Sequence, residues 1–290
     1  MAMELSRTET VRFSNENMLV KLLDNVREAD VFVIQSSCPP VSDNIIETFL
    51  LLDALKHSSA ARVTAVLPYF PYVRSDKKDQ PRISIAAKLM ANLHQTAGAQ
   101  RFLTMDLHSP QIQGFFDVPV DQLLATDVFC EHFKKKNLAG SVIVAADVGE
   151  AKHLGQYANR LNLPMAIIDK RRIGNSDKVV PTHLIGDVEG LNALIIDDEV
   201  ASAGTLFKAT EFLKENGAKT VTAAVVHPIL SGKALEKINN SPLDELVVTN
   251  TIPVLDKAKK CPKITTLSVA PLFAKAIQRI HNGDSISVLF

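Results

Sequence analysis

The chain has 290 residues, of which 46% are hydrophobic and 22% are charged. This balance is typical of a folded protein of about two domains, and it excludes disordered, collagen-like and low-complexity classes. The 32 basic and 32 acidic residues cancel to a net charge of +0. Because no overall field attracts nucleic acid or anionic lipid, we expect neither a nucleic-acid nor a membrane partner, and any anion site must be local.

Cysteine usage and the polar start of the chain indicate a cytoplasmic protein. Cys38, Cys130 and Cys261 are odd in number and far apart, which fits neither a disulfide framework nor a paired zinc motif. We interpret them as packing residues in a reducing compartment. The start MAMELSRTET lacks the apolar segment of a signal peptide, and no window reaches the roughly eighteen apolar residues of a membrane span.

Short runs rich in Val and Ile alternate with stretches of helical spacing. In chain order, the pattern predicts strands over residues 31–37, 62–70, 101–107, 141–149, 165–171, 191–199 and 220–228. It predicts helices over residues 44–55, 85–97, 201–216 and 271–281. Near-continuous apolar strands separated by helices indicate parallel sheets that are covered on both faces. The expected fold class is therefore α/β, with doubly wound parallel sheets.

The charged segment 134–140, which ends in Gly140, is the best candidate linker. It divides the chain into two similar halves, residues 1–139 and 140–290. The final predicted helix, 271–281, is a candidate to pack back on the first domain.

Polar side chains gather where the predicted strands end. These strand ends are Arg74–Asp79, Asp106–His108, Asp147–Gly149, Asp169–Arg172 and Asp197–Thr205. In open parallel sheets, ligands bind beyond the carboxyl ends of the strands, where the following helices direct their N-termini. We therefore expect the chemistry of this protein at these five places.

The strongest motif is the acidic pair Asp197–Asp198, which follows the buried strand Leu194–Ile196. Two adjacent carboxylates suit the vicinal hydroxyls of a sugar, directly or through a divalent cation. The small-residue turn from Ala201 to Thr205 opens a helix and offers backbone N–H groups and two hydroxyls to a phosphate. The order strand, acids, turn and helix predicts a sugar-phosphate site. The alternative is that Asp198 or Ser202 only caps the helix.

The segment 195–205 resembles the phosphoribosyl-diphosphate binding loop of type I phosphoribosyltransferases. The rest of the chain resembles the ribose-phosphate pyrophosphokinases, also called phosphoribosyl pyrophosphate synthetases. The matching motifs occur in the family's order over most of residues 31–290, and they include VFVIQSS, LPYFPYVRSDKK, TMDLHSPQIQGFFDVPVD, AIIDKRR, IGDVEG and LSVAPLFAKAIQRIHNGDSISVLF. The resemblance implies two domains of type I phosphoribosyltransferase-like topology.

The resemblance also implies a reaction. Members of this family transfer the β,γ-diphosphate of ATP to the anomeric hydroxyl of ribose 5-phosphate, with Mg²⁺ as cofactor, and form AMP and the activated sugar. The implied partners are ATP and ribose 5-phosphate. The implied assembly is a homo-oligomer built from dimers, with a hexamer as one form.

Site residues carry over by position. The resemblance implies ATP contacts from Phe13, Asn15, Arg74, Ser75, Asp76, Lys77 and His108. It implies Mg²⁺ ligation by His108 and Asp147, and a mobile catalytic loop containing Lys170 and Arg172. It implies contacts to ribose 5-phosphate from Asp197, Asp198, Ser202, Ala203, Gly204 and Thr205. Without the resemblance, His108 also fits a buried histidine that donates to a carbonyl, and the basic strand ends also fit solvated surface charge.

The sequence departs from the family pattern at several of these positions. Arg12-Phe-Ser-Asn-Glu-Asn17 replaces an arginine-phenylalanine-serine-aspartate-glycine-glutamate segment that a neighbouring subunit contributes to adenine binding. Ser75 replaces a glutamine, Glu150 a glycine, and Ala201 an aspartate of the bacterial and animal forms. These departures and a short N-terminus leave a non-catalytic regulatory homologue as an alternative, with a nucleobase phosphoribosyltransferase as a weaker one.

Overall fold

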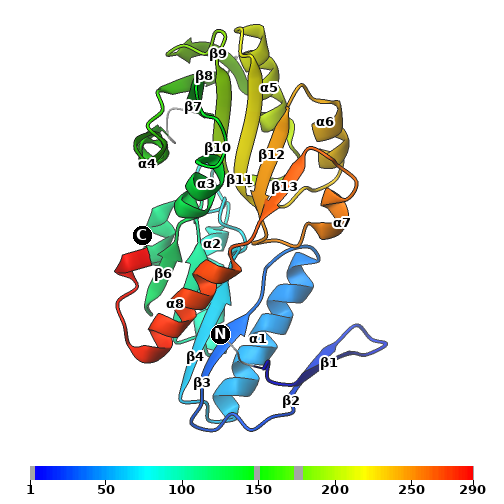
Figure 1. The fold of residues 1–290 in the computed structure, drawn as a ribbon. Helices are drawn as coiled ribbons and strands as arrows, with labels where there is room; N and C mark the ends of the chain where they lie inside the picture. Colours follow the sequence, from blue (N-terminus) through cyan, green and yellow to red (C-terminus); the bar gives the residue numbers. More distant parts are fainter. Residues whose placement is uncertain (1–3, 147–150, 173–178, 290) are drawn as a thin grey trace. The chain divides into compact units, whose positions relative to one another are not determined.

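A computed structural model describes residues 4–146, 151–172 and 179–289. Contacts between the residues divide the chain into two compact units. The first unit comprises Met1–Leu124 together with Ala270–Phe290, and the second comprises Ala125–Val269. Figure 1 shows the elements of each unit.

The first unit is built on a sheet of four parallel strands in the order β3-β4-β5-β6. The strands are β3 (Asp30–Ile34), β4 (Arg62–Leu67), β5 (Arg101–Met105) and β6 (Val120–Leu123). The helices of this unit are α1 (Val41–His57), α2 (Ala86–Ala97), η1 (Pro110–Phe115), α8 (Ala270–Asn282) and η2 (Ser287–Leu289). Both faces of β4 are buried, since Val63 and Ala65 pack in one cluster with Leu52 of α1, while Val66 is also fully buried.

A separate antiparallel hairpin precedes this sheet. It consists of β1 (Thr8–Arg12) and β2 (Met18–Leu22). In its turn, the N–H of Phe13 donates to the carbonyl oxygen of Asn17 at 2.9 Å. The guanidinium of Arg12 pairs with the carboxylate of Asp43 on α1 at 2.5 Å. The hairpin is thus tied to the unit through α1.

The second unit is built on a sheet of seven strands in the order β13-β12-β11-β10-β7-β8-β9. The strands are β7 (Ser141–Ala145), β8 (Met165–Arg172), β9 (Val179–Ile185), β10 (Asn192–Val200), β11 (Thr220–Pro228), β12 (Glu245–Thr249) and β13 (Ile264–Leu267). The helices are α3 (Thr126–Phe133), α4 (Ala151–Leu161), α5 (Gly204–Glu215), α6 (Ala234–Asn240) and α7 (Leu255–Ala258). All strand pairs are parallel except β8 with β9.

Helices cover both faces of the second sheet, with α3 and α4 on one side and α5 and α6 on the other (Figure 1). Leu206 and Leu213 of α5 belong to one buried cluster with Ile195 of β10. The alternate residues Leu194 and Ile196 are buried as well. This pattern confirms the α/β fold class with doubly wound parallel sheets.

The unit boundary differs from the division at residue 139 that the sequence predicts. The second unit begins at Ala125, because α3 packs against α4 and Asp127 pairs with Arg160. The predicted linker is part of the second unit, where Lys136 Nζ lies 2.5 Å from Glu245 Oε2 of β12. The final helix α8 lies in the first unit, where Arg62 Nη2 donates to the carbonyl oxygen of Ile280 at 3.1 Å.

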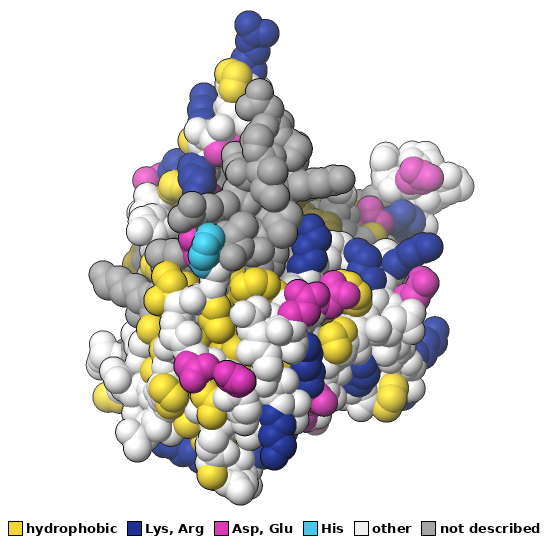
Figure 2. Space-filling view, turned by 90° about the horizontal axis from the view of Figure 1, so that it is seen from above, with side chains coloured by type: hydrophobic (Ala, Val, Ile, Leu, Met, Phe, Trp, Pro, Cys, Tyr) yellow, Lys and Arg dark blue, Asp and Glu magenta, His cyan; other side chains and the backbone are white. Residues whose placement is uncertain are grey.

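Charges of both signs are interspersed on the face of the molecule that Figure 2 shows. This distribution agrees with the net charge of +0. Within the described ranges, every helix is too short or too polar to cross a lipid bilayer.

Candidate functional site

The acidic pair lies at the end of a buried strand, as the sequence predicts. β10 continues past Ile196, and Asp197 and Glu199 stay in register with Val225 and His227 of β11. The N–H of Asp198 donates to Asp197 Oδ1 at 2.9 Å. Because the parallel ladder fixes the backbone, two half-buried carboxylates are held at the carboxyl edge of the sheet.

A left-handed residue connects this strand to α5. Ala203 has φ +58° and ψ +12°, and its methyl group is buried in the same cluster as Leu206. The N–H of Phe207 donates to the Ala203 carbonyl at 3.0 Å, so the helix begins at once. The N-cap position is Ala203, which has no side-chain cap hydrogen bond, so neither Asp198 nor Ser202 occupies the N-cap as the alternative requires. The first amides of a helix have no intrahelical acceptor and favour an anion.

The loop after β11 holds the turn of residues 201–203 in place. The N–H of Ser231 donates to the Ala201 carbonyl at 2.9 Å, and that of Leu230 donates to the Val200 carbonyl at 3.0 Å. Lys257 Nζ in turn donates to the carbonyl oxygens of Ile229 and Leu230 at 2.8 and 3.0 Å. The turn that follows the acids is therefore supported by a second strand end.

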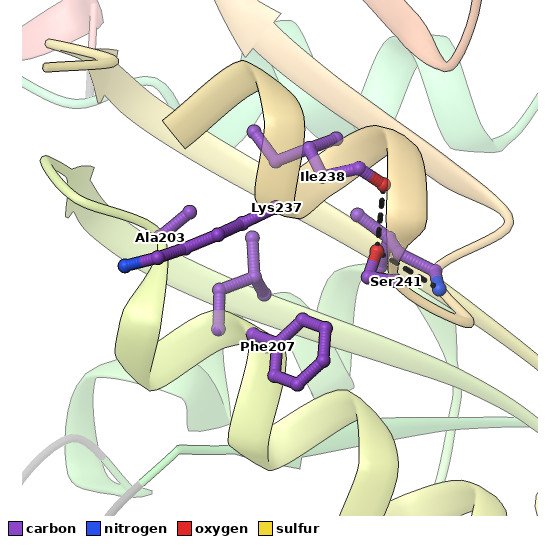
Figure 3. A pocket seen from close by; sticks show the side chains of 7 residues that line it. Ala203, Phe207, Lys237, Ile238 and Ser241 are labelled. Atoms are coloured by element: carbon purple, nitrogen blue, oxygen red, sulfur yellow. Dashed lines mark hydrogen bonds between the residues drawn. The ribbon is translucent and has the colours of Figure 1, made fainter. Parts of the chain in front are cut away.

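The sequence analysis missed Lys237 of α6. Its Nζ donates to the carbonyl oxygen of Ser202 at 3.1 Å. Figure 3 shows its side chain extended from α6 toward Ala203. No spacing rule identifies this residue, because Lys237 and Ser202 are 35 positions apart and meet only through the packing of α6 beside α5.

In the first unit, Arg74 and His108 follow the neighbouring strands β4 and β5. Both side chains are exposed, as is Lys77, while Ser75 and Asp76 are half-buried. An exposed His108 contradicts the alternative of a buried histidine. Parallel strands place these two loops at the same edge of the sheet, so the structure supports the expectation that the loops lie together.

Two aromatic residues, Phe70 and Tyr72, precede these cations in the sequence and differ in burial. Phe70 is 1% exposed and packs against Phe116 with a centroid distance of 5.4 Å. Tyr72 is 45% exposed and has φ +58°. Of the two, only Tyr72 therefore offers a ring face to a ligand.

Phe13 and Asn15 lie in the turn of the β1–β2 hairpin, and both are exposed. Asn15 Oδ1 accepts from the N–H of Asn17 at 3.1 Å. Glu16, where the family pattern has glycine, has φ +66°, a conformation that favours glycine. The turn therefore keeps a glycine-type backbone although its sequence has changed.

Of the remaining predicted site residues, the structure describes the backbone of Lys170 and Arg172 but not Asp147. Asp147 and Glu150 lie outside the described residues. The backbone of Lys170 and Arg172 lies in β8, opposite Pro181 and Val179 of β9, and their side chains lie outside the description. The backbone of both lies in a paired strand and not in the loop that the resemblance implies, because the antiparallel partner β9 continues the ladder.

The predicted packing role of the cysteines is confirmed at two of three positions. Cys38, Cys130 and Cys261 are free thiols. Cys130 and Cys261 are buried, and burial raises the pKa of the Cys130 thiol. Cys38 is half-buried. Among all described residues, no group of three or more His, Cys, Asp or Glu side chains is placed to hold a metal ion.

The second unit combines a doubly wound parallel sheet, an acidic strand end, and a small-residue turn that leads into a helix. This combination is typical of proteins that bind sugar phosphates. Comparison with known proteins identifies the family within this class. A family model described as the N-terminal domain of ribose phosphate pyrophosphokinase matches residues 1–98. A second model, described as a phosphoribosyl synthetase-associated domain, matches residues 172–290.

Individual relatives agree along the whole chain. The ribose-phosphate pyrophosphokinase of Deinococcus radiodurans is 48% identical over 292 residues, which cover 99% of this chain and 90% of that protein. The enzyme of the same name from Helicobacter pylori is 46% identical over 286 residues, which cover 99% and 89%. A crystal structure of phosphoribosylpyrophosphate synthetase from Mycobacterium smegmatis has a TM-score of 0.91 and 36% identity, and the match covers 97% of this chain and 92% of that one.

The chain belongs to the ribose-phosphate pyrophosphokinase family of enzymes. The predicted resemblance and fold are thereby confirmed. The comparisons favour an enzyme over a non-catalytic homologue and over a nucleobase phosphoribosyltransferase.

Proposed function

We propose that this chain transfers the β,γ-diphosphate of ATP to the C1 hydroxyl of ribose 5-phosphate, giving phosphoribosyl pyrophosphate and AMP. The observation that carries the proposal is the end of β10, where two half-buried carboxylates lead through the left-handed Ala203 into the uncapped α5. The names of the relatives support the same reaction.

In this reaction the C1 oxygen forms a bond to the β-phosphorus of ATP. The bond from that phosphorus to the oxygen shared with the α-phosphate breaks, AMP leaves with this oxygen, and the hydroxyl proton is released. Negative charge gathers between two phosphorylated substrates, so the protein must supply positioned cations and N–H donors.

The sugar substrate is assigned to the second unit. Asp197 and Asp198 accept hydrogen bonds from the ribose hydroxyls. The turn residues Ser202, Ala203, Gly204 and Thr205 bind the 5-phosphate through backbone N–H groups and hydroxyls. The exposure of Ser202 and Thr205 supports this assignment, because both hydroxyls are accessible to a ligand.

The nucleotide is assigned to the loops after β4 and β5, with Arg74, Ser75, Asp76, Lys77 and His108 as ATP contacts. The exposed positions of Arg74, Lys77 and His108 support this role. Lys170 and Arg172 are proposed as the catalytic cations. Their position in the motif AIIDKRR, after Asp169 and directly before a polar segment, supports this role.

Mg²⁺ is proposed as cofactor, held by His108 and Asp147 together with the phosphates of the nucleotide. Mg²⁺ in proteins keeps several waters and takes one or two side-chain ligands besides the phosphates of its substrate. The exposed imidazole of His108 fits such a partial set, while Asp147 lies outside the described residues. When bound, the ion would neutralise charge on the diphosphate.

We further propose that the enzyme is cytoplasmic and forms a homo-oligomer built from dimers, with a hexamer as one form. Its three free cysteines support a reducing compartment. The exposed Phe13 and Asn15 at the tip of the β1–β2 hairpin support a contact to the nucleotide of a neighbouring subunit. Light scattering coupled to size-exclusion chromatography would measure the assembly.

Asp198→Asn tests the site. We expect the purified protein to form AMP from MgATP only when ribose 5-phosphate is present. Because Asp198→Asn removes the charge of one acceptor, we expect it to raise KM for ribose 5-phosphate by about 10- to 100-fold. The measurement is AMP release at varied ribose 5-phosphate and saturating MgATP.

Asp256→Asn is the matched control, because Asp256 is exposed on α7 and pairs only loosely with Lys259 at 3.3 Å. This variant should keep the KM of the wild type. No AMP from the wild type at high enzyme concentration would refute the reaction. An unchanged KM in Asp198→Asn would refute the ribose assignment alone.

A further inference from the structure

The ammonium group of Lys237 lies at the start of a helix that is not its own. Its Nζ donates to the Ser202 carbonyl oxygen at 3.1 Å, and a Cβ built on Gly204 would lie 3.8 Å from it. Figure 3 shows the extended side chain crossing from α6 toward Ala203. A cation therefore sits beside the turn that is assigned to the 5-phosphate.

The packing of α6 and α5 defines the reach of this side chain. Lys237 is half-buried and lines a small pocket together with Leu206 and Phe207 of α5. The next residue, Ile238, is 2% exposed. Ser241 Oγ donates to the Ile238 carbonyl at 2.8 Å, and so closes the end of α6. Because α6 is anchored at this end, the ammonium group is directed to the turn.

The peptide group between Ser202 and Ala203 is the part of the turn that Lys237 holds. In a planar trans peptide the C=O and the N–H point in opposite directions. A hydrogen bond from Lys237 to the Ser202 carbonyl therefore turns the N–H of Ala203 the other way. Ala203 needs such support, since a left-handed conformation is unfavourable for an L-residue with a side chain.

The charge of Lys237 points to an anionic ligand. A helix N-terminus carries partial positive charge, so an ammonium group placed there is unfavourable in the free protein. A bound phosphate removes this conflict, because it is attracted by both the helix and the lysine. A neutral sugar has no charge with which to offset the repulsion between the ammonium group and the helix N-terminus. The arrangement thus favours a phosphorylated substrate.

We infer that Lys237 is a positioning residue for the 5-phosphate of ribose 5-phosphate: it orients the Ser202–Ala203 peptide and adds positive charge beside it. The inference rests on the proposed function, since it assigns ribose 5-phosphate to this turn. It adds a residue from α6 to a site otherwise formed by β10 and the start of α5.

Replacement of the lysine tests the inference. Lys237→Met keeps the length of the stem and removes the charge and the donor. We expect it to raise KM for ribose 5-phosphate about tenfold, while kcat and KM for ATP stay within about twofold. Lys237→Arg, which keeps both properties, should restore KM for ribose 5-phosphate to within about twofold of the wild type. The measurement is AMP release with MgATP and ribose 5-phosphate.

Lys214→Met is the matched control. Lys214 lies on α5, and its Nζ also donates to a backbone carbonyl, that of Lys219, at 3.0 Å. The control should leave KM for ribose 5-phosphate unchanged. The melting temperature of ligand-free Lys237→Met should stay within about 2 °C of the wild type, because the loss of the hydrogen bond to the turn is offset by removal of a positive charge from the helix N-terminus.

Two results would overturn the inference. One is an unchanged KM for ribose 5-phosphate in Lys237→Met. The other is an equal rise of both KM values together with a large fall of the melting temperature, which would indicate a merely structural lysine. A wild-type protein that forms no AMP would instead refute the proposed function, so the two failures are distinguishable.

Discussion

His94 is a titratable side chain that is buried among aromatic rings. It has no exposed surface and lies 4.7 Å from Phe49 and 5.8 Å from Phe70, measured between ring centroids. Burial lowers the pKa of His94 from 6.5 to about 4, although its Nδ1–H donates to the Met90 carbonyl and opposes the shift. Its Nε2 has no partner among the described residues. His94 is therefore neutral at physiological pH.

This lowered pKa predicts acid sensitivity. The unfolded chain binds a proton near pH 6.5 that the folded chain takes up only near pH 4. The free energy of unfolding should therefore fall by up to about 1.4 kcal/mol per pH unit as the pH drops through this window. His94→Phe should flatten the slope, as measured by urea denaturation between pH 7 and 4. His57→Gln, at an exposed histidine, should not, and an equal effect of both variants would contradict the argument.

At the scale of single elements, three side chains attach α8 to the first sheet. Asp30 Oδ1 accepts from Arg62 Nε at 2.7 Å, and Asp30 Oδ2 lies 2.7 Å from His281 Nδ1 of α8. Burial alone would raise the pKa of Asp30, but hydrogen bonds from Arg62 and His281 outweigh it and hold the pKa below its ordinary value of 3.8. The ionised carboxylate is therefore the form that the fold favours.

Asp30→Asn should lower the free energy of unfolding by about 1 to 2 kcal/mol, because it removes a carboxylate shared by two donors. The contribution of Asp30 is present above pH 3.8 and is lost as the pH falls through its lower pKa in the folded state, so wild type and variant should converge in acid. Urea denaturation at pH 7 and below pH 3 measures this. Asp24→Asn, at an exposed pair with Arg7, should have a smaller effect, and the reverse order would contradict the assignment.

The sequence predicts those helices and strands that are specified by the periodicity of their own residues. The apolar run of β10 and the helix after Gly204 occur where the periodicity indicates. β9 was missed, because its short run contains Pro181 and it pairs only as an antiparallel edge. The small-residue turn was predicted, but the left-handed Ala203 and the contact of Lys237 depend on packing between distant segments. Local pattern specifies the strand end, whereas tertiary contacts complete the site.

At the scale of the whole molecule, the first unit is discontinuous in sequence. Residues 270–290 complete a body that otherwise ends at Leu124. α8 contributes the buried side chains of Phe273, Ile277 and Ile280 to it. Each of these stabilises by about 1.5 to 3 kcal/mol, and together they approach the total stability of an ordinary domain. The first unit therefore depends on residues 270–290.

A chain that ends at Val269 should lose the fold of its first unit and keep that of the second. Hydrogen exchange measured by mass spectrometry should show fast exchange for β4 and continued protection for β10. A chain that ends at Ile286 is the control, since it lacks η2 but keeps α8. Protection of β4 in the chain that ends at Val269 would contradict the dependence on α8.

The same discontinuity has a consequence during synthesis on the ribosome. Translation proceeds from the N-terminus, so Ala125–Val269, which is continuous in sequence, is synthesised in full before Ala270–Phe290. The segment before it, although made first, gains α8 only after residues 270–290 have been synthesised. The second unit is therefore free to fold before the first unit gains α8, which reverses the order in which most of their residues are translated.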